Sequence, residues 1–405
     1  MPPNRHSISF YFLLLTGIPA WYFFVDFLFL SLYNRTRRKT MITITKKLDL
    51  PDTYPLDRIG PLSDLLFFDI ETTGFSGDTS NLYLIGCTYF QEGSWNLIQW
   101  FADTRQAESE LLDAFFAFMK RFKTLIHFNG DHFDIPYLEK CCRRLGLSHS
   151  FEGMESMDIY KKIRPYRKLL GLESMKQKAI EQFLGISRED KYTGGQLIEV
   201  YRDYLHTHEK SLYDLLILHN EDDLKGMPAI LPILSYADFF SSPLFPQAPE
   251  LWEGDCTEPT DTPLLHLMGT ASVSVPVPLE YSSGPVSLEL YENKAVCTIR
   301  LCRGCLKYFY PDYKDYYYLP FEDTAVHKSV GEYVDRSARK KATARTCYTK
   351  KEGLFLPQFG PFKDPSFRED YKSPLTYVLY DDSLFSQPQA TDTYFSQLFC
   401  WLLEQ

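Results

Sequence analysis

The chain has 405 residues, of which 44% are hydrophobic and 24% charged, and its formal net charge is −10. This composition suits a globular protein with a sizeable core and about two domains. The acidic balance argues against a generally basic nucleic-acid binder, but it permits a carboxylate-rich site with local basic patches. The nine cysteines lack the four-ligand spacing of a structural zinc site, which favours reduced thiols in a cytosolic protein.

The first forty residues are strongly apolar and have two interpretations. Residues 10–33 are almost wholly apolar, and this length suffices for a helix that spans a bilayer. Four basic residues between positions 35 and 39 would keep the rest of the chain on the cytoplasmic side of such a membrane anchor. Alternatively, residues 1–40 result from a misassigned start, because Met41 opens a stretch typical of the beginning of a soluble protein.

Regular elements follow a polar lead-in at residues 41–61. Apolar runs bounded by turn residues predict strands at 65–70, 82–90, 94–101 and 124–128. Apolar residues at helical spacing predict helices at 106–122, 133–145, 173–185, 196–206 and 211–225. Strands followed by alternating helices and strands describe a mixed α/β sheet flanked by helices, which we place at residues 62–236.

A smaller second domain is predicted beyond a proline-rich linker at residues 237–262. Period-two alternation at 271–277 and 286–290, together with an apolar run at 296–301, indicates strands. Residues 263–405 are therefore predicted to form a β-rich C-terminal domain.

Two carboxylates end the first predicted strand. Asp69 and Glu71 are two residues apart, so a strand places both on one face. Burying two carboxylates side by side is costly unless a cation or a proton compensates their charge. The apolar run into Asp-Ile-Glu-Thr therefore predicts a metal site, although this pair alone would also fit a surface turn.

Two further segments supply acidic residues. Asp134 lies where a short strand ends and a helix begins, a place where the helix dipole also favours a carboxylate. In the helix at 211–225, His219 and Asp223 lie one turn apart on the face that carries the core leucines. An inward His and Asp require partners, and Asp222 is the alternative ligand if the helical register differs by one residue.

Four inward carboxylates from three elements match the ligand set of two divalent cations. Their oxygen atoms favour Mg²⁺ or Mn²⁺. Two such ions can activate a water and stabilise the leaving oxygen in phosphodiester hydrolysis. The constellation therefore predicts a site for two divalent metals, and Asp69, Glu71, Asp134 and Asp223 are its candidate ligands.

These residues resemble the motifs of known nucleases. The sequence at 69–72 resembles the first motif of DEDD exonucleases, and residues 129–137 are similar to the second motif of the proofreading domain of family-B DNA polymerases. Residues 219–223, after Leu169-Leu-Gly and Tyr192-Thr-Gly-Gly, resemble bacterial YprB-type ribonuclease H-like proteins. The resemblance implies a ribonuclease H-like fold over residues 62–236 and 3′-to-5′ exonuclease activity on single-stranded ends. It also implies that the four acids bind metal.

His219 departs from the DEDD pattern, because a His stands at the spacing that these enzymes give to a Tyr before the last Asp. As a neutral imidazole, His219 is predicted to orient or deprotonate the attacking water. Asn129 and Asn220 are weaker candidates for contact with the nucleic-acid chain.

The C-terminal part combines aromatic and basic residues. Residues 300–318 interleave tyrosines with Arg and Lys, and residues 336–351 carry seven basic side chains and no acidic one. Because aromatic rings stack on bases while cations follow phosphates, Arg339, Lys340 and Lys341 are predicted contacts with nucleic acid. Alternatively, the tyrosines form a domain core beside a solvated basic face.

The sequence thus predicts a metal-dependent nuclease with His219 and the four acids as catalytic residues, and with no small-molecule cofactor. Two other functions stay open. One is a nucleic-acid-binding module that has a nuclease fold but little activity, and the other is a membrane-tethered scaffold that uses residues 10–33. The choice between DNA and RNA is also open, because nothing in the sequence reports a 2′-hydroxyl contact.

Overall fold

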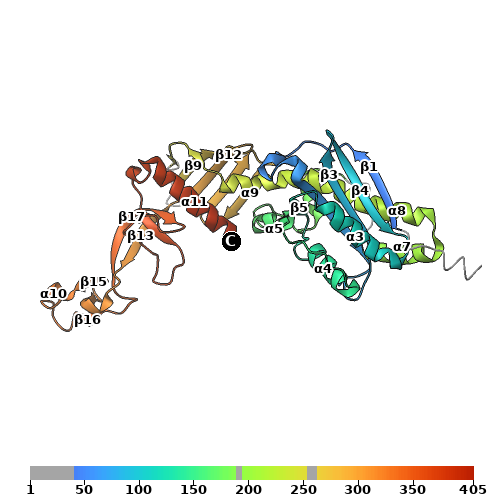
Figure 1. Ribbon diagram of the computed structural model, residues 1–405. Helices are drawn as coiled ribbons and strands as arrows, with labels where there is room; N and C mark the ends of the chain where they lie inside the picture. Colours follow the sequence, from blue (N-terminus) through green and yellow to red (C-terminus); the bar gives the residue numbers. More distant parts are fainter. Residues whose placement is uncertain (1–40, 188–193, 253–261) are drawn as a thin grey trace, which may run out of the picture. The chain divides into compact units, whose positions relative to one another are not determined.

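The computed structural model describes residues 41–187, 194–252 and 262–405, which form two compact units (Figure 1). The first unit comprises residues 41–50, 56–157 and 194–225, and the second comprises the other described residues. Among the described residues, no helix is long and apolar enough to cross a membrane. The anchor predicted at residues 10–33 lies outside them, as does Tyr192 of the family motif. The domain limits placed at 236 and 263 stay predictions.

A six-stranded mixed sheet forms the centre of the first unit, in the order β1-β4-β3-β2-β5-β6. Adjacent strands are antiparallel from β1 to β2, whereas β2 and β5 run parallel. The predicted mixed sheet is therefore confirmed. Its strands are β1 (Met41–Leu48), β2 (Leu65–Thr72), β3 (Leu82–Gln91), β4 (Ser94–Ala102), β5 (Thr124–His127) and β6 (Glu155–Asp158).

Helices pack on both faces of this sheet. The ring of Phe115 in α3 contacts Phe68 and Trp100, whereas Asn220 in α8 bonds to Asp69. Since successive residues of a strand point to opposite faces, α3 and α8 lie on opposite sides of the sheet (Figure 1). The helices that begin in this unit are α3 (Glu108–Met119), α4 (Asp134–Leu145), α7 (Gly194–Thr207) and α8 (Lys210–Ile230).

The polar lead-in expected at residues 41–61 is partly wrong, because β1 is an edge strand of the sheet. All of β1 pairs with β4, from Met41 opposite Ala102 to Leu48 opposite Trp95. The alternation of isoleucine and threonine at 42–45 is the period-two pattern of a half-buried strand, and both isoleucines pack against the core.

The second unit is rich in β structure, which confirms the predicted C-terminal fold class. Its sheets have the orders β10-β11-β12-β9-β7, β13-β17-β18 and β15-β14-β16, and β8 also pairs with β9. Its strands are β7 (Phe245–Pro246), β8 (Glu250–Trp252), β9 (Leu264–Thr270), β10 (Leu279–Ser283), β11 (Val286–Tyr291), β12 (Lys294–Arg300), β13 (Cys302–Phe309), β14 (Tyr316–Leu319), β15 (Thr324–His327), β16 (Lys340–Lys341), β17 (Tyr348–Gln358) and β18 (Thr376–Leu379). Its helices are α5 (Ile159–Ile163), α6 (Gln177–Phe183), α9 (Leu234–Ser241), α10 (Lys328–Gly331) and α11 (Pro388–Glu404).

Three features of the second unit differ from the prediction. The strand expected at 271–277 does not form, and these residues lie in bends and coil between β9 and β10. The expected linker at 237–262 contains β7 and β8, which both pair with β9 and so extend its sheet. Helix α11 also lies in the region that was predicted, from its β pattern alone, to be rich in strands. It forms because Tyr394, Leu398 and Leu402 recur at helical spacing and are buried together.

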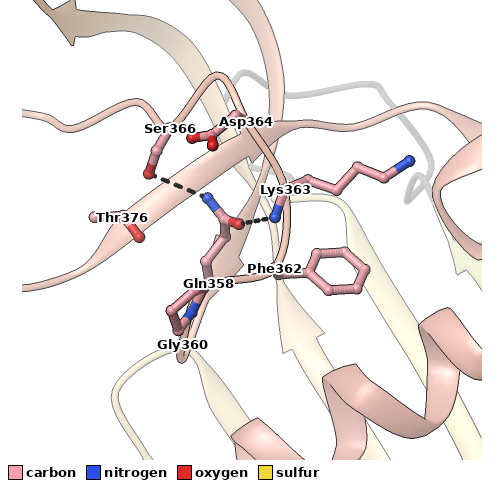
Figure 2. A pocket seen from close by; sticks show the side chains of 8 residues that line it. Gln358, Gly360, Phe362, Lys363, Asp364, Ser366 and Thr376 are labelled. Atoms are coloured by element: carbon pink, nitrogen blue, oxygen red, sulfur yellow. Dashed lines mark hydrogen bonds between the residues drawn. The ribbon is translucent and has the colours of Figure 1, made fainter.

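A cavity of about 430 Å³ lies in the second unit beside the end of β17 (Figure 2). Its polar lining residues are Gln358, Lys363, Asp364, Ser366 and Thr376. The side-chain carbonyl of Gln358 accepts from the backbone N–H of Lys363 at 2.7 Å, and its amide donates to Ser366 Oγ at 3.2 Å. Both polar atoms of the Gln358 side chain are therefore satisfied, and the cavity does not by itself indicate a reaction.

Candidate metal centre and active site

The end of β2 carries the pair of carboxylates that the sequence indicates. Between Glu71 and Thr72 the pairing with β3 shifts, so that Tyr83 is an extra residue between their partners Leu84 and Leu82. Such a β-bulge redirects a side chain near the end of a strand. The buried Tyr83 hydroxyl donates to Glu71 Oε2 at 3.3 Å. Burial and the adjacent Glu71 raise the pKa of Tyr83, so its hydroxyl stays a donor.

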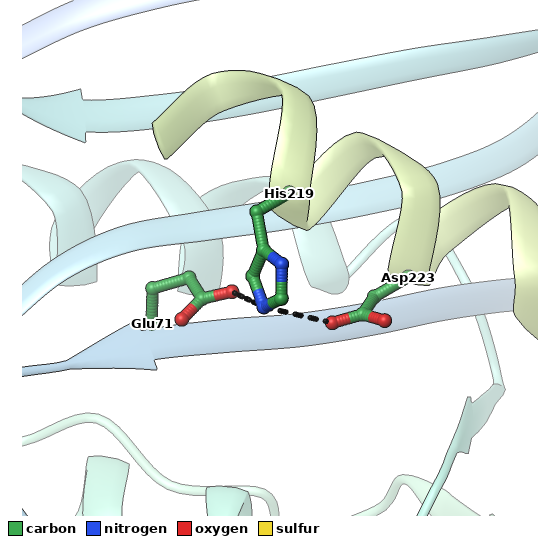
Figure 3. Close-up of side chains that lie close together, drawn as sticks. All are labelled: Glu71, His219 and Asp223. Atoms are coloured by element: carbon green, nitrogen blue, oxygen red, sulfur yellow. Dashed lines mark ion pairs between the residues drawn. The ribbon is translucent and has the colours of Figure 1, made fainter. Parts of the chain in front are cut away.

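Helix α8 brings His219 and Asp223 to this strand end (Figure 3). The Nε2 atom of the buried His219 lies 3.6 Å from Glu71 Oε1 and 3.5 Å from Asp223 Oδ2. The three side chains form a group whose ligand atoms lie close enough to hold a metal ion. The helical face predicted for His219 and Asp223 therefore meets Glu71, and Asp222 is not part of this group.

Asp134 is the buried first residue of α4, and a tight loop presents it. Asn129 has a φ of +64°, a left-handed conformation that asparagine tolerates better than most residues. Its carbonyl accepts from the backbone N–H groups of His132 and Phe133, which turns the chain into the helix. The backbone N–H of Gly130 donates to His127 Nδ1 at 3.0 Å and fixes the start of the loop.

The four acids share one electrostatic environment. Burial raises the pKa of Asp69 well above its usual value, and repulsion from Asp223, Asp134 and Glu71 raises it further. A hydrogen bond from Asn220 opposes this shift. Carboxylates that repel one another in a buried site are stabilised by a cation, and their oxygen atoms suit Mg²⁺ or Mn²⁺. The donor set therefore fits divalent metal ions.

A comparison with protein families assigns this part of the chain. Residues 66–234 match the model RNase_H_2 of the RNase_H superfamily. This segment is therefore similar in sequence to the RNase H superfamily. It contains all four acids and His219, and the resemblance to ribonuclease H-like proteins is thereby confirmed. A search of curated proteins finds no match for the chain.

Solved structures of a DNA polymerase and of an exonuclease resemble the chain over part of its length. The family B DNA polymerase of Pyrobaculum calidifontis has a TM-score of 0.37 and 13% identity, over 50% of this chain and 30% of the polymerase. E. coli exonuclease I with single-stranded DNA and zinc has a TM-score of 0.25 and 15% identity, over 38% and 43%. The same enzyme with a dA16 oligonucleotide has a TM-score of 0.24 and 14% identity, over 51% and 54%. The chain thus spans about a third to just over half of their lengths.

Asn220 in the RNase H domain differs from its expected role. We expected a contact with nucleic acid, but its side chain is fully buried. Its Nδ2 donates to Asp69 Oδ2 and its Oδ1 accepts from Gln99 Nε2, both at 2.9 Å. Sequence reasoning missed Gln99 and Tyr83. The only signal for either was a polar residue inside an apolar strand.

The predicted basic contacts lie outside the RNase H domain, in the second unit. Lys340 and Lys341 are exposed on the short edge strand β16, opposite Tyr318 and Tyr317. Arg339 is partly buried, and its guanidinium lies 4.6 Å from the centre of the Tyr317 ring. Arg339 also donates to the carbonyl of Gly331. Of the three, the two lysines are the exposed cations.

Proposed function

We propose that the RNase H domain is a metal-dependent nuclease that hydrolyses phosphodiester bonds. The observation that carries this proposal is the convergence of β2 and α8, which sets the Nε2 atom of His219 between Glu71 and Asp223. The raised pKa of Asp69 supports it, because Asp134 and Asp223 contribute to that shift from separate elements. Similarity to the RNase H superfamily agrees with this chemistry.

Asp69, Glu71, Asp134 and Asp223 would hold two ions of Mg²⁺ or Mn²⁺. Such ions supply positive charge that stabilises the pentavalent phosphate in the transition state. Tyr83 would keep Glu71 oriented through its hydroxyl. His219 would accept a proton at Nε2 from the attacking water, whose oxygen forms the new bond to phosphorus while the bond to the leaving 3′ oxygen breaks. A neutral imidazole suits this task near neutral pH.

We propose a single-stranded 3′ end as the substrate of this site, as the DEDD-like motifs imply. Phe75 supports a single strand, because its ring is 92% exposed only four residues beyond Glu71. Thr72 stabilises the loop that carries Phe75, because the Thr72 hydroxyl donates to the carbonyl of Gly74 at 2.7 Å. An exposed ring on a fixed loop suits stacking with an unpaired base.

The test is degradation of end-labelled single-stranded DNA and RNA with Mg²⁺, Mn²⁺ or EDTA. The Asp69→Asn and Asp223→Asn variants are nearly isosteric and serve as controls. We expect metal-dependent shortening from the 3′ end by the parent chain and at least a hundredfold slower shortening by both variants. Shortening that continues in EDTA, or equal rates in parent and variants, would exclude this site as the source of activity.

A second proposed function is binding of nucleic acid by the second unit. Four exposed cations, Arg336, Lys340, Lys341 and Arg345, have no ion pair among the described residues. Aromatic side chains accompany them, including Tyr333, which is 92% exposed. Unpaired cations beside exposed rings suit a phosphate backbone and its bases.

This binding is tested by fluorescence anisotropy with single-stranded oligonucleotides at several salt concentrations, using Lys340→Gln/Lys341→Gln. Each lost phosphate contact should weaken binding and flatten the slope of log affinity against log salt by about 0.7. The control is a paired substitution of two lysines of the first unit. Lys120 is exposed and Lys140 is partly exposed. An unchanged salt slope would reject the role of these two lysines.

A further inference from the structure

Three residues on adjacent strands form one row across the sheet of the first unit. Asp69 in β2 pairs with Gly86 in β3, and Gly86 pairs with Gln99 in β4. Directly paired residues of neighbouring strands point to the same face. The row therefore places the Gln99 amide and the Asp69 carboxylate on the α8 side of the sheet, with no side chain between them.

Gly86 leaves the gap into which α8 packs. A Cβ atom at this position would lie 2.1 Å from Asn220 Oδ1 and 2.4 Å from Leu224 Cδ1. Since real Cβ atoms do not approach other atoms so closely, any side chain at this position would force the Asn220 and Leu224 side chains to move. The Asn220 amide occupies the space above the glycine and connects the two ends of the row.

The hydrogen bonds in this row have a fixed direction. Gln99 Nε2 donates to the backbone carbonyl of Ile217 at 3.1 Å, and a carbonyl can only accept. The same Nε2 donates to Asn220 Oδ1, so Asn220 must present its Nδ2 to Asp69. The Oε1 atom of Gln99 has no partner among the described residues, yet turning the amide over would break two bonds. Gln99 thus sets the orientation of Asn220.

We infer that Asn220 and Gln99 are positioning residues, which hold the Asp69 carboxylate in one orientation for a divalent cation. This inference rests on the proposed metal site. Asn220 binds Oδ2 of Asp69, while Oδ1 accepts no hydrogen bond from the described residues and is the oxygen left for a cation. An amide suits this place because it donates without adding charge beside four carboxylates. Gln99 acts only through Asn220.

The test measures Mn²⁺ binding by isothermal titration calorimetry on the full chain, without substrate. Asn220→Leu keeps the branched shape but removes the donor, and Gln99→Met keeps the length but removes the amide. Loss of a hydrogen bond that orients a metal ligand typically weakens metal affinity about 10- to 100-fold. We expect a loss of this size for Asn220→Leu and a smaller one for Gln99→Met.

The double variant distinguishes positioning from a general effect on folding. Because Gln99 acts through Asn220, Asn220→Leu/Gln99→Met should bind Mn²⁺ no more weakly than Asn220→Leu alone. Asn96→Leu is the matched control, since Asn96 is on the same strand but bonds only within its own hairpin. We expect it to bind Mn²⁺ like the parent. Circular dichroism and melting in EDTA will show that each variant is folded.

The outcomes separate this inference from the proposed function. If Asp69→Asn loses Mn²⁺ binding while Asn220→Leu and Gln99→Met bind like the parent, the positioning role is overturned and the metal site stands. Additive losses in the double variant would also overturn the role of Gln99. If the folded parent binds no Mn²⁺, the proposed metal site fails, and the inference fails with it.

Discussion

At the residue scale, Asp69 is a carboxylate in surroundings that disfavour its charge. Burial and three other acids raise its pKa, and the hydrogen bond from Asn220 compensates only in part. The folded protein therefore holds the Asp69 proton more tightly than the unfolded chain does. The stabilising contribution of this proton is fully present below the unfolded pKa of 3.8 and is lost as pH rises through the higher folded pKa.

The substitution Asp69→Asn should consequently stabilise the metal-free protein at pH 7. Asparagine keeps an acceptor for Asn220 and carries no charge. In EDTA we expect its melting temperature to exceed that of the parent by a few degrees, since about 1 kcal/mol corresponds to about 2–4 °C in a domain of this size. The difference should shrink as pH falls toward 4. A less stable variant in EDTA at pH 7 would contradict this account.

Tyr83 gives a second prediction at this scale. Tyr83→Phe removes the donor to Glu71 Oε2 but keeps the stacking of the ring on Tyr201, at 4.2 Å between centroids. We expect the free energy of unfolding in EDTA to fall by about 1 kcal/mol, the usual value of one buried hydrogen bond. Urea denaturation measures this change. Tyr201→Phe, which loses a hydroxyl bond to the carbonyl of Ala102 instead, should leave Mn²⁺ affinity unchanged.

At the scale of elements, the site depends on how closely α8 approaches the sheet. Helix α8 carries His219, Asn220 and Asp223. Any change in the distance between α8 and the sheet therefore moves these three site residues together. Gly86 permits this close approach, because the Asn220 and Leu224 side chains of α8 occupy the space that a Cβ atom at position 86 would fill. A residue that is not itself a metal ligand therefore affects the geometry of the site.

The substitution Gly86→Ala tests this dependence. The added methyl would overlap Asn220 and Leu224, and overpacking of this kind costs about 1–3 kcal/mol. We expect lower stability in urea and weaker Mn²⁺ binding together. Gly195→Ala is the control, because Gly195 lies in α7 with open space around its Cβ position. Alanine there should be neutral or stabilising by up to about 1 kcal/mol. Equal behaviour of the two variants would contradict the role of Gly86.

At the scale of the whole molecule, the order of segments along the chain does not follow their division into two compact units. Residues 158–187 interrupt the first unit in the sequence but belong to the second. Within the second unit, Tyr166 of this segment stacks on Phe240, and Phe240 contacts Phe399 of α11. The metal ligands, by contrast, all lie in the first unit. The two units should therefore respond differently to metal.

Hydrogen exchange measured by mass spectrometry checks this expectation. A ligand slows only those opening motions that disrupt its site. Saturating Mn²⁺ should slow amide exchange in β2 and α8, while exchange in the sheets between residues 264 and 379 should stay the same. In Asp69→Asn the slowing should disappear. Equal protection of both units in the parent would show that metal stabilises the chain elsewhere.

The sequence by itself determined those secondary-structure elements and candidate acidic residues that follow from local patterns. Period-two and helical spacing predicted most elements of the first unit, and the face of α8 that carries His219 and Asp223 was read from its leucines. The family of the domain also followed from short motifs. These features are local, since each depends on residues within a few turns or along one strand.

Only the tertiary structure decided which side chains from distant segments meet. Tyr83 reaches Glu71 through a bulge, and Gln99 reaches Asp69 through a helix more than a hundred residues away in the chain. Strand register and helix packing create these contacts, and neither leaves a periodic signal in the sequence. Asn220 shows the difference most clearly, because its motif placed it near the site, whereas only the hydrogen bonds of the folded chain show that it contacts Asp69 and Gln99.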